Sequence, residues 1–254
     1  MPAPPEPCRV LILGGTSEGA ALARRLDGDP CFDVVSSIAG ATRNPAALPG
    51  RLARGGFGGA DGLAAYLKAE RIERVVDATH PFSPRISTNA VQACRQAGVP
   101  LLQLVRPPWR REPGDRWIEV EDAAAAAQVL PAHGRRAFLT LGRRELSAFT
   151  VLPGVWILAR VIDRRDIPPA APFEFMVGRG PFRRDAEAAL LTEHAIDVVV
   201  SRNSGGHATY AKIEAARRLG IAVVMLRRPA KPEAAAVDSV EAALAWLKEG
   251  RDGG

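Results

Sequence analysis

The sequence predicts an α/β protein of two Rossmann-like lobes, each with a mainly parallel sheet, and with a cleft between the lobes. Two observations predict this fold. Short apolar runs, typical of buried parallel strands, alternate along the chain with segments whose apolar residues recur at helical spacing. Between the halves stand Pro107 and Pro108, which are typical of a stiff linker. We therefore expect residues 1–108 to form the first lobe and residues 109–254 the second.

The expected elements follow one another in a regular order. In the first half, apolar runs predict strands at residues 9–13, 32–38, 51–54, 74–78 and 100–105. Helical spacing predicts helices at residues 16–26, 61–70 and 86–97, the last of which ends at Gly98. In the second half, strands are expected at residues 137–141, 156–162, 197–201 and 222–226. The helices expected there cover residues 144–149, 183–194, 209–219 and 239–248.

Several protein classes are excluded by what the sequence lacks. No apolar run approaches the roughly 18 residues of a membrane span, so we expect no membrane association. The first seven residues have neither the basic nor the apolar region of a signal peptide, and a cytoplasmic location follows as the expectation. The three cysteines, Cys8, Cys31 and Cys94, show no C-x-x-C spacing. This argues against a disulfide framework and against a metal site.

The positive charge of the chain is concentrated in its second half. The net charge is +6, with 34 basic and 28 acidic residues. Residues 1–130 carry 15 basic and 14 acidic side chains, whereas residues 131–254 carry 19 and 14. Such an excess favours an anionic partner, either nucleic acid, an anionic surface or a small polyanion. Because only four of the basic residues are lysines, an arginine-rich genomic composition is the alternative explanation.

A glycine turn follows the first strand and precedes the first helix. This geometry offers backbone N–H groups and a positive helix end to a phosphate. Gly14 and Gly19 occupy the outer positions of the dinucleotide fingerprint, and Thr16 occupies the middle one. We expect the Thr16 hydroxyl to donate to a phosphate oxygen. The expected cofactor-binding residues here are Gly14, Gly15, Thr16, Ser17 and Glu18.

The second strand indicates which dinucleotide is bound. An NAD site usually carries Asp or Glu about 20 residues beyond the glycines, to bind the ribose 2′-hydroxyl. Here the strand ends with Ser36 and Ser37, and Arg43 follows, with no acidic residue. A 2′-phosphate would be accepted by these side chains. The sequence therefore predicts NADPH rather than NADH.

Polar residues at the end of the 74–78 strand form a third segment. Ligands of open α/β sheets bind at the carboxyl ends of the strands, so Thr79 and His80 are expected to contact the cofactor. His80 can also exchange a proton near neutral pH. The structural alternative is that His80 and Asp77 only hydrogen-bond the turn.

The fourth segment is a second anion-binding turn, in the other half. Six of its residues are expected to bind substrate: Ser201, Arg202, Asn203, Ser204, Gly205 and Lys212. Tyr210 and Lys212 are two residues apart, so the Tyr-x-x-x-Lys couple of short-chain dehydrogenases is absent. Residues 178–182 also precede a helix, and a plain turn with proline at the helix start is the favoured interpretation there.

These segments together resemble one enzyme family over residues 9–228. The blocks are Gly-Gly-Thr-Ser-Glu-Gly at 14–19, Asp-Ala-Thr-His-Pro-Phe at 77–82, Arg-Pro-Pro-Trp at 106–109 and Ser-Arg-Asn-Ser-Gly-Gly at 201–206. In this order and at these separations they are similar to the precorrin-6A reductases of cobalamin biosynthesis. The resemblance implies NADPH-dependent reduction of one C=C bond of the precorrin-6A macrocycle, which gives precorrin-6B. A cobalt-containing substrate is used in the anaerobic route, and the sequence does not separate the two.

The reduction needs a proton as well as a hydride, and its donor stays open between His80, Tyr210, Lys212 and water. A family substrate with several carboxylates would suit the basic second half. Three rival functions also stay open. They are an NADP(H)-dependent reductase of another anionic substrate, a non-catalytic nucleotide-sensing module, and a nucleic-acid binder. The last has little support, because no nucleic-acid motif is present and only 6% of residues are aromatic.

Overall fold

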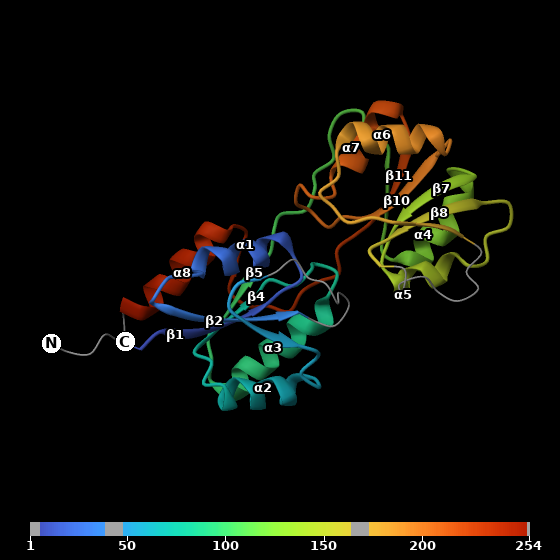
Figure 1. Ribbon diagram of the computed structural model, residues 1–254. Helices are drawn as coiled ribbons and strands as arrows, with labels where there is room; N and C mark the ends of the chain where they lie inside the picture. The colour runs from blue at the N-terminus through green and yellow to red at the C-terminus, as the bar shows by residue number, and fades with distance from the viewer. Residues whose placement is uncertain (1–5, 39–47, 164–172, 253–254) are drawn as a thin grey trace. The chain divides into compact units, whose positions relative to one another are not determined.

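A computed structural model describes residues 6–38, 48–163 and 173–252, and it divides the chain into two compact units (Figure 1). Unit 1 combines Met1–Pro107 with Ala230–Gly254, and unit 2 is Pro108–Pro229. Each unit has its own six-stranded, fully parallel sheet with helices on both faces. The predicted α/β class with two Rossmann-like lobes is confirmed.

The sheet of unit 1 has the strand order β12-β5-β4-β1-β2-β3. Its strands are β1 (Cys8–Leu13), β2 (Phe32–Ile38), β3 (Arg51–Arg54), β4 (Arg74–Asp77), β5 (Leu101–Leu104) and β12 (Ala236–Val237). Since the chain runs outward from β1 to β3 and then crosses back to β4, the order reverses between β1 and β4. This is the doubly wound arrangement, and ligands bind outside the carboxyl ends of the strands at such a reversal.

Two layers of helices bury the sheet of unit 1. Helices α1 (Ser17–Leu26) and α8 (Val240–Asp252) cover one face, and α2 (Ala60–Ala69) and α3 (Pro84–Ala97) cover the other (Figure 1). Alternate residues of β1 serve the two cores: Val10 and Ile12 pack with α1 and α8, whereas Leu11 and Leu13 pack with α2 and α3. This double burial explains why residues 10–13 of the strand form one continuous apolar run.

Unit 2 repeats this topology with the order β6-β11-β10-β7-β8-β9. Its strands are β6 (Trp117–Val120), β7 (Arg136–Thr140), β8 (Trp156–Val161), β9 (Glu174–Val177), β10 (Val198–Arg202) and β11 (Ala222–Leu226). Helices α6 (Arg184–Glu193) and α7 (Ala211–Leu219) cover one face, and α4 (Ala123–Val129) and α5 (Arg143–Leu146) the other (Figure 1). The 3₁₀ turns η1 (Leu130–Ala132) and η2 (Ser147–Phe149) extend α4 and α5. Here the reversal lies between β7 and β10.

The predicted extent of the second lobe, residues 109–254, needs correction. From Ala230 onward the chain belongs to unit 1, where β12 pairs in parallel with β5. The reason is apolar burial, because Ala243 and Leu247 of α8 are fully buried in the core that α1 and β1 share. Unit 2 fills the corresponding outer position of its own sheet with β6, which pairs with β11. Strands β6, β9 and β12 and helix α4 were not expected from the sequence.

Most other elements lie where the sequence predicts them, within a few residues at their ends. The helix expected at residues 144–149 is instead the single turn α5 followed by η2. Across the described ranges, no helix has both the length and the apolar character to span a bilayer.

Candidate functional site

The reversal between β1 and β4 places the glycine turn beside the segment that follows β4. The N–H of Ala78 donates to the carbonyl of Leu13 (2.9 Å), so the two strand ends are held together. Gly14 donates its N–H to the carbonyl of Ser37 at the end of β2 (2.7 Å). The three predicted cofactor segments of unit 1 therefore meet at the carboxyl ends of the neighbouring strands β4, β1 and β2.

Two glycines of the turn are required by its geometry. Gly15 has a φ of +132°, a conformation that side chains disfavour. At Gly19 a Cβ would stand 2.9 Å from the Cβ of Ala78, so only glycine lets α1 approach β4 this closely. In the described residues, no hydrogen bond uses the N–H groups of Gly15, Ser17 or Glu18. These groups stand at the positive end of α1 and can bind a phosphate.

The Thr16 hydroxyl differs from its expected role. It accepts from the N–H of Gly19 (3.1 Å) as the N-cap of α1, and it donates its proton to the carbonyl of Ala78 (2.8 Å). Because a hydroxyl has one proton, none is left to donate to a phosphate oxygen. Thr16 instead fixes the start of α1 against the end of β4.

Glu18 lies in the first turn of α1 and is paired with a cation. Its Oε2 accepts from Nη1 of Arg106 at 2.9 Å, and from the hydroxyl of Ser17 at 3.1 Å. The pairing offsets a carboxylate that would otherwise repel a phosphate at this helix end. The sequence analysis did not assign Arg106 to the site, although its Arg-Pro-Pro-Trp block was noted.

The residues expected to select the cofactor lie at the end of β2. Ser36 and Ser37 are both buried, and the Ser36 hydroxyl has no hydrogen-bond partner. A buried hydroxyl without a partner is unfavourable, which makes it a candidate contact for a bound ribose. Arg43 lies outside the described residues.

The turn after β4 is organised by a buried carboxylate. Oδ1 of Asp77 accepts from both the N–H (3.0 Å) and the hydroxyl (2.6 Å) of Thr79. Thr79 is buried and its hydroxyl donates to Asp77 inside the turn. It therefore stabilises the turn, which differs from the expected contact with the cofactor. His80 is half-buried, and its Nδ1 accepts from the N–H of Phe82 (3.2 Å). The ring hydrogen of neutral His80 is thereby assigned to Nε2, which makes Nε2 a donor.

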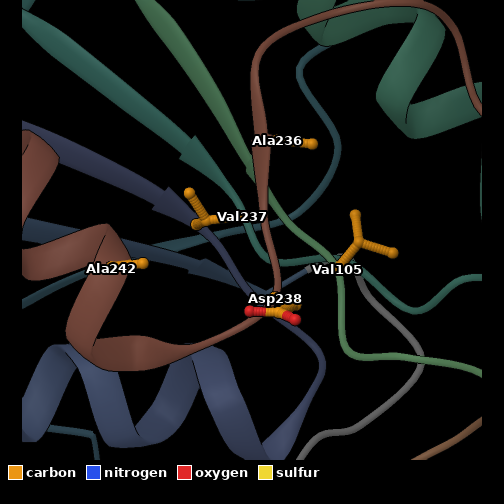
Figure 2. Close-up of a pocket in the computed structure, with 5 residues that line it drawn as sticks. All are labelled: Val105, Ala236, Val237, Asp238 and Ala242. Atoms are coloured by element: carbon orange, nitrogen blue, oxygen red, sulfur yellow. The ribbon is translucent and has the colours of Figure 1, made fainter.

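A shallow hollow of about 440 Å³ lies at the next strand ends of the same sheet. It is lined by Val105, Ala236, Val237, Asp238 and Ala242, which belong to the segment after β5, to β12 and to the start of α8 (Figure 2). Because β5 adjoins β4, this hollow lies on the β4 side of the reversal. It opens at the carboxyl ends of the strands, where doubly wound sheets bind their ligands.

In unit 2, the segment after β10 forms a turn that is clamped to Trp109. The Asn203 side chain accepts from the Trp109 N–H (2.8 Å) and donates to the Trp109 carbonyl (3.0 Å). The indole N–H of Trp109 donates to the carbonyl of Gly206 (2.8 Å). The Asn203 amide is thus used inside the protein, which differs from the expected substrate contact. Gly205 and Gly206 both have positive φ, of 66° and 74°.

Two of the expected substrate residues differ in how they are held. Ser201 is buried and its hydroxyl donates to the carbonyl of Arg202 (3.3 Å), so it stabilises the backbone of this turn. Arg202 is partly exposed and lies 3.5 Å from the carboxylate of Glu145. The same Glu145 oxygen accepts from the N–H of Gly142 (2.6 Å).

The Gly142–Glu145 segment follows β7 and was missed in the sequence analysis. It stands opposite Arg202 because the strand order reverses between β7 and β10. The signal was present: Gly-Arg-Arg-Glu directly follows an apolar strand, as the glycine turn of unit 1 does. Arg143 and Arg144 add two positive charges to this edge.

Lys212 is buried in the first turn of α7. Its ammonium donates to the carbonyl of Thr209 (2.7 Å) and lies 5.0 Å from the centre of the Trp109 ring. Burial lowers the pKa of Lys212 to about 7, against a smaller opposing effect of the Glu187 carboxylate. An amine with such a pKa exchanges protons at neutral pH.

Tyr210 is placed less favourably for proton donation. Its hydroxyl donates to Glu112 (2.9 Å) and accepts from Arg217 (2.7 Å). Burial raises the pKa of Tyr210 above its ordinary value of 10. The phenol is therefore part of a network that joins residues 109–116 to α7. Among the described side chains, no group of three or more His, Cys, Asp or Glu could hold a metal ion.

Comparison with known proteins identifies the family. A family model described as "Precorrin-6x reductase CbiJ/CobK" matches residues 9–248. The chain belongs to this family. It is 48% identical to the precorrin-6A reductase of Rhodococcus erythropolis over 94% of this chain and 97% of that relative. It is 47% identical to that of Mycobacterium tuberculosis over the same shares of the two chains.

Two further comparisons define the range of the family. A cobalt-precorrin-6A reductase of Salmonella typhimurium is 31% identical over 87% of each chain. A solved structure described as "CobK precorrin-6A reductase" has a TM-score of 0.89 and 41% identity, and it covers 95% of this chain and 96% of that one. The chain is therefore an oxidoreductase of the precorrin-6x reductase family, which uses a nicotinamide cofactor. The unused N–H groups at α1 and the unpartnered Ser36 hydroxyl fit such a dinucleotide.

Proposed function

We propose that this chain reduces one C=C bond of precorrin-6A with NADPH, giving precorrin-6B in cobalamin biosynthesis. The observation that carries the proposal is its identity of 47–48% over almost the full length of curated precorrin-6A reductases. The structure adds a doubly wound unit whose glycine turn has free N–H groups at a helix end. This is the geometry that a dinucleotide pyrophosphate requires.

The metal-free macrocycle is the proposed substrate. Identity is 41–48% with precorrin-6A reductases and 26–31% with cobalt-precorrin-6A reductases. The higher identity supports the substrate of the first group.

The cofactor is proposed to lie along the carboxyl edge of the unit 1 sheet. Its pyrophosphate would accept from the N–H groups of Gly15, Ser17 and Glu18 at the start of α1. Its adenosine ribose would lie at Ser36 and Ser37, where no acidic side chain opposes a 2′-phosphate. When bound, the nicotinamide supplies the hydride. The protein contributes position and orientation, with the β4 turn and the hollow of Figure 2 on the nicotinamide side.

The substrate carboxylates are proposed to bind in unit 2. Arg202 and the backbone N–H of Gly205 stand at the reversal between β7 and β10, and Arg143 stands at its other side. The Ser204 N–H already donates to the carbonyl of Arg202 (2.7 Å). An arginine can bind a carboxylate through two parallel hydrogen bonds. Ser201 and Asn203 support this turn from within, because their polar atoms already have protein partners.

We propose that Lys212 supplies the proton that the reduced C=C bond takes up, and that His80 donates a hydrogen bond to the cofactor. Burial lowers the pKa of Lys212 to about 7, and in the described residues its Nζ uses one N–H to donate to the carbonyl of Thr209, so we propose that another N–H of the ammonium supplies the proton. His80 accepts from the Phe82 N–H at Nδ1, which assigns the ring hydrogen of the neutral form to Nε2, and we propose that this N–H donates to the bound cofactor. Tyr210 is assigned no transfer role, since its hydroxyl proton is held by Glu112.

Absorbance of the reduced nicotinamide tests the proposal. Purified protein with precorrin-6A and NADPH should lose this absorbance, and NADH should be oxidised much more slowly. Binding of NADPH without turnover would indicate the nucleotide-sensing module instead. Faster turnover of cobalt-precorrin-6A would contradict the choice of substrate.

The preference for NADPH has a separate test in Arg43. Arg43→Ala should raise the KM for NADPH much more than the KM for NADH. An equal rise for both cofactors would remove Arg43 from the 2′-phosphate site. Lys68→Ala, on the exposed side of α2, provides the control for loss of a positive charge from the same unit.

A further inference from the structure

The carboxylate of Asp77 has a second partner that comes from a distant part of the chain. Its Oδ2 lies 3.3 Å from Nζ of Lys231, 154 residues further on. Asp77 is fully buried, and the Lys231 side chain is only 11% exposed. Over the described ranges, Lys231 is the one cation within ion-pair distance of this carboxylate.

Lys231 is itself held in place by its neighbours. It stands at the point where the chain re-enters unit 1. The carbonyl of Pro232 accepts from the Gln103 side chain (3.1 Å), and that of Ala235 accepts from the Gln103 N–H (2.8 Å). Gln103 is a buried residue of β5, next to β4. The ammonium is therefore presented to Asp77 from a segment anchored on the adjacent strand.

The ion pair is continuous with the contacts that shape the cofactor edge. Asp77 holds Thr79 through two hydrogen bonds, of 3.0 and 2.6 Å. Between these two residues stands Ala78, whose carbonyl accepts from Thr16, the N-cap of α1. A chain of contacts thus runs from the Lys231 ammonium to the turn after β4 and on to the start of α1.

We propose that Lys231 is a positioning residue for the cofactor turn, a role that rests on the proposed NADPH site. A buried carboxylate without a cation is strongly unfavourable, so without Lys231 the Asp77 carboxylate would turn toward solvent. In that position it would hold the Thr79 N–H and hydroxyl less well. The turn would then be ordered only when the cofactor binds, and that ordering would weaken binding.

A purely structural role for the pair gives a different expectation. The pair could serve only to fasten residues 230–232 to unit 1. Loss of Lys231 would then lower the Tm but leave NADPH affinity unchanged at temperatures where the protein is folded. The two roles are therefore separated by affinity rather than by stability.

The experiment compares Lys231→Met, Lys231→Arg and the control Lys68→Met in the full chain, with NADPH as the probe. Cofactor affinity is measured by fluorescence titration, and folding by the Tm. Supporting residues contribute about 10–100-fold to affinity at metal sites, and we expect a loss of about tenfold for Lys231→Met. Lys231→Arg should recover most of the loss, and Lys68→Met should bind as the wild type does. An unchanged NADPH affinity in a folded Lys231→Met variant would overturn the proposal.

A second variant keeps the test valid if Lys231→Met folds poorly. Asp77→Asn combined with Lys231→Met removes both charges, while the Asn carbonyl can still accept from Thr79. We expect this double variant to fold and to bind NADPH more tightly than Lys231→Met. Equal weakness of the two would overturn the route through Asp77. If the wild type reduces precorrin-6A and the variants bind NADPH as tightly as it does, the positioning role alone is refuted. If the wild type does not bind NADPH, the proposed cofactor site itself is refuted.

Discussion

Arg106 Nη1 lies 2.9 Å from Glu18 Oε2, and this pair joins the segment after β5 to the first turn of α1. Both side chains are largely buried, with exposed fractions of 13% and 22%. The glycine turn thus carries an acidic residue at the helix end where we place the cofactor phosphates. Arg106 offsets that charge and makes the site compatible with an anion.

Arg106→Met should therefore weaken NADPH binding by about tenfold, or about 1.4 kcal/mol. The physical reason is that the Glu18 carboxylate would face the phosphates without its cation. Glu18→Gln in the same chain should restore most of the affinity, because it removes the repulsion. A double-mutant cycle with fluorescence titration measures this coupling. Additive effects of the two substitutions would show that the pair does not act on the cofactor.

Gly19→Ala should destabilise unit 1 by about 1–3 kcal/mol, as overpacking of a tight contact does. The added Cβ would stand 2.9 Å from the Cβ of Ala78 and push α1 away from β4. Gly56→Ala is the matched control, since a Cβ there meets nothing within 4 Å. Urea unfolding of both variants provides the measurement. Equal stability of the two would mean that α1 can shift freely at this contact.

Asn203→Ala should release Trp109 and destabilise unit 2 by about 1–3 kcal/mol, because the Trp109 N–H and carbonyl lose their partners. The indole is also in contact with Lys212 and Tyr210, so tryptophan fluorescence should change. Gln128→Ala, an exposed amide on α4, is the control. Unfolding monitored by fluorescence and circular dichroism checks both effects. A variant as stable as this control would contradict the clamp.

The stability of the protein should rise with pH between about 7 and 9. Lys212 has a pKa of about 7 when folded and an ordinary value of 10.5. In this interval the unfolded chain binds more protons than the folded one, and stability then increases with pH. Lys212→Met removes the titrating group and should flatten the rise. The free energy of unfolding, measured with denaturant at a series of pH values, tests this prediction. If this free energy depends on pH in the same way in the wild type and the variant, the lowered pKa of Lys212 is contradicted.

Local patterns predicted most of the fold. The β1 strand is recognisable because both faces of the sheet are covered, so residues 10–13 are all apolar. The end of α3 is recognisable because Gly98 adopts the left-handed conformation that stops a helix. Residues 230–254 were misassigned because membership of a unit depends on non-local pairing. The pairing of β12 with β5, more than 130 residues away, leaves no local signal.

The site was predicted less completely, for the same reason. The sequence identified which strand ends carry polar residues, but not which atoms were already in use. Asn203 has the chemistry of a ligand, yet its amide is occupied by Trp109, 94 residues earlier. The proton of the Thr16 hydroxyl is likewise taken by Ala78. Side-chain chemistry shows what a residue can bind, whereas the folded contacts decide what it is free to bind.

The most direct test of the proposed function follows hydrogen from cofactor to product. Protein, precorrin-6A and NADPH carrying deuterium at both C4 positions of the nicotinamide are incubated, and the macrocycle is analysed by mass spectrometry. The product should gain one deuterium from the cofactor and one hydrogen from solvent, and unlabelled NADPH should give the same product without deuterium. An unchanged macrocycle, or a reduced one without deuterium from the labelled cofactor, would contradict hydride transfer from NADPH to precorrin-6A.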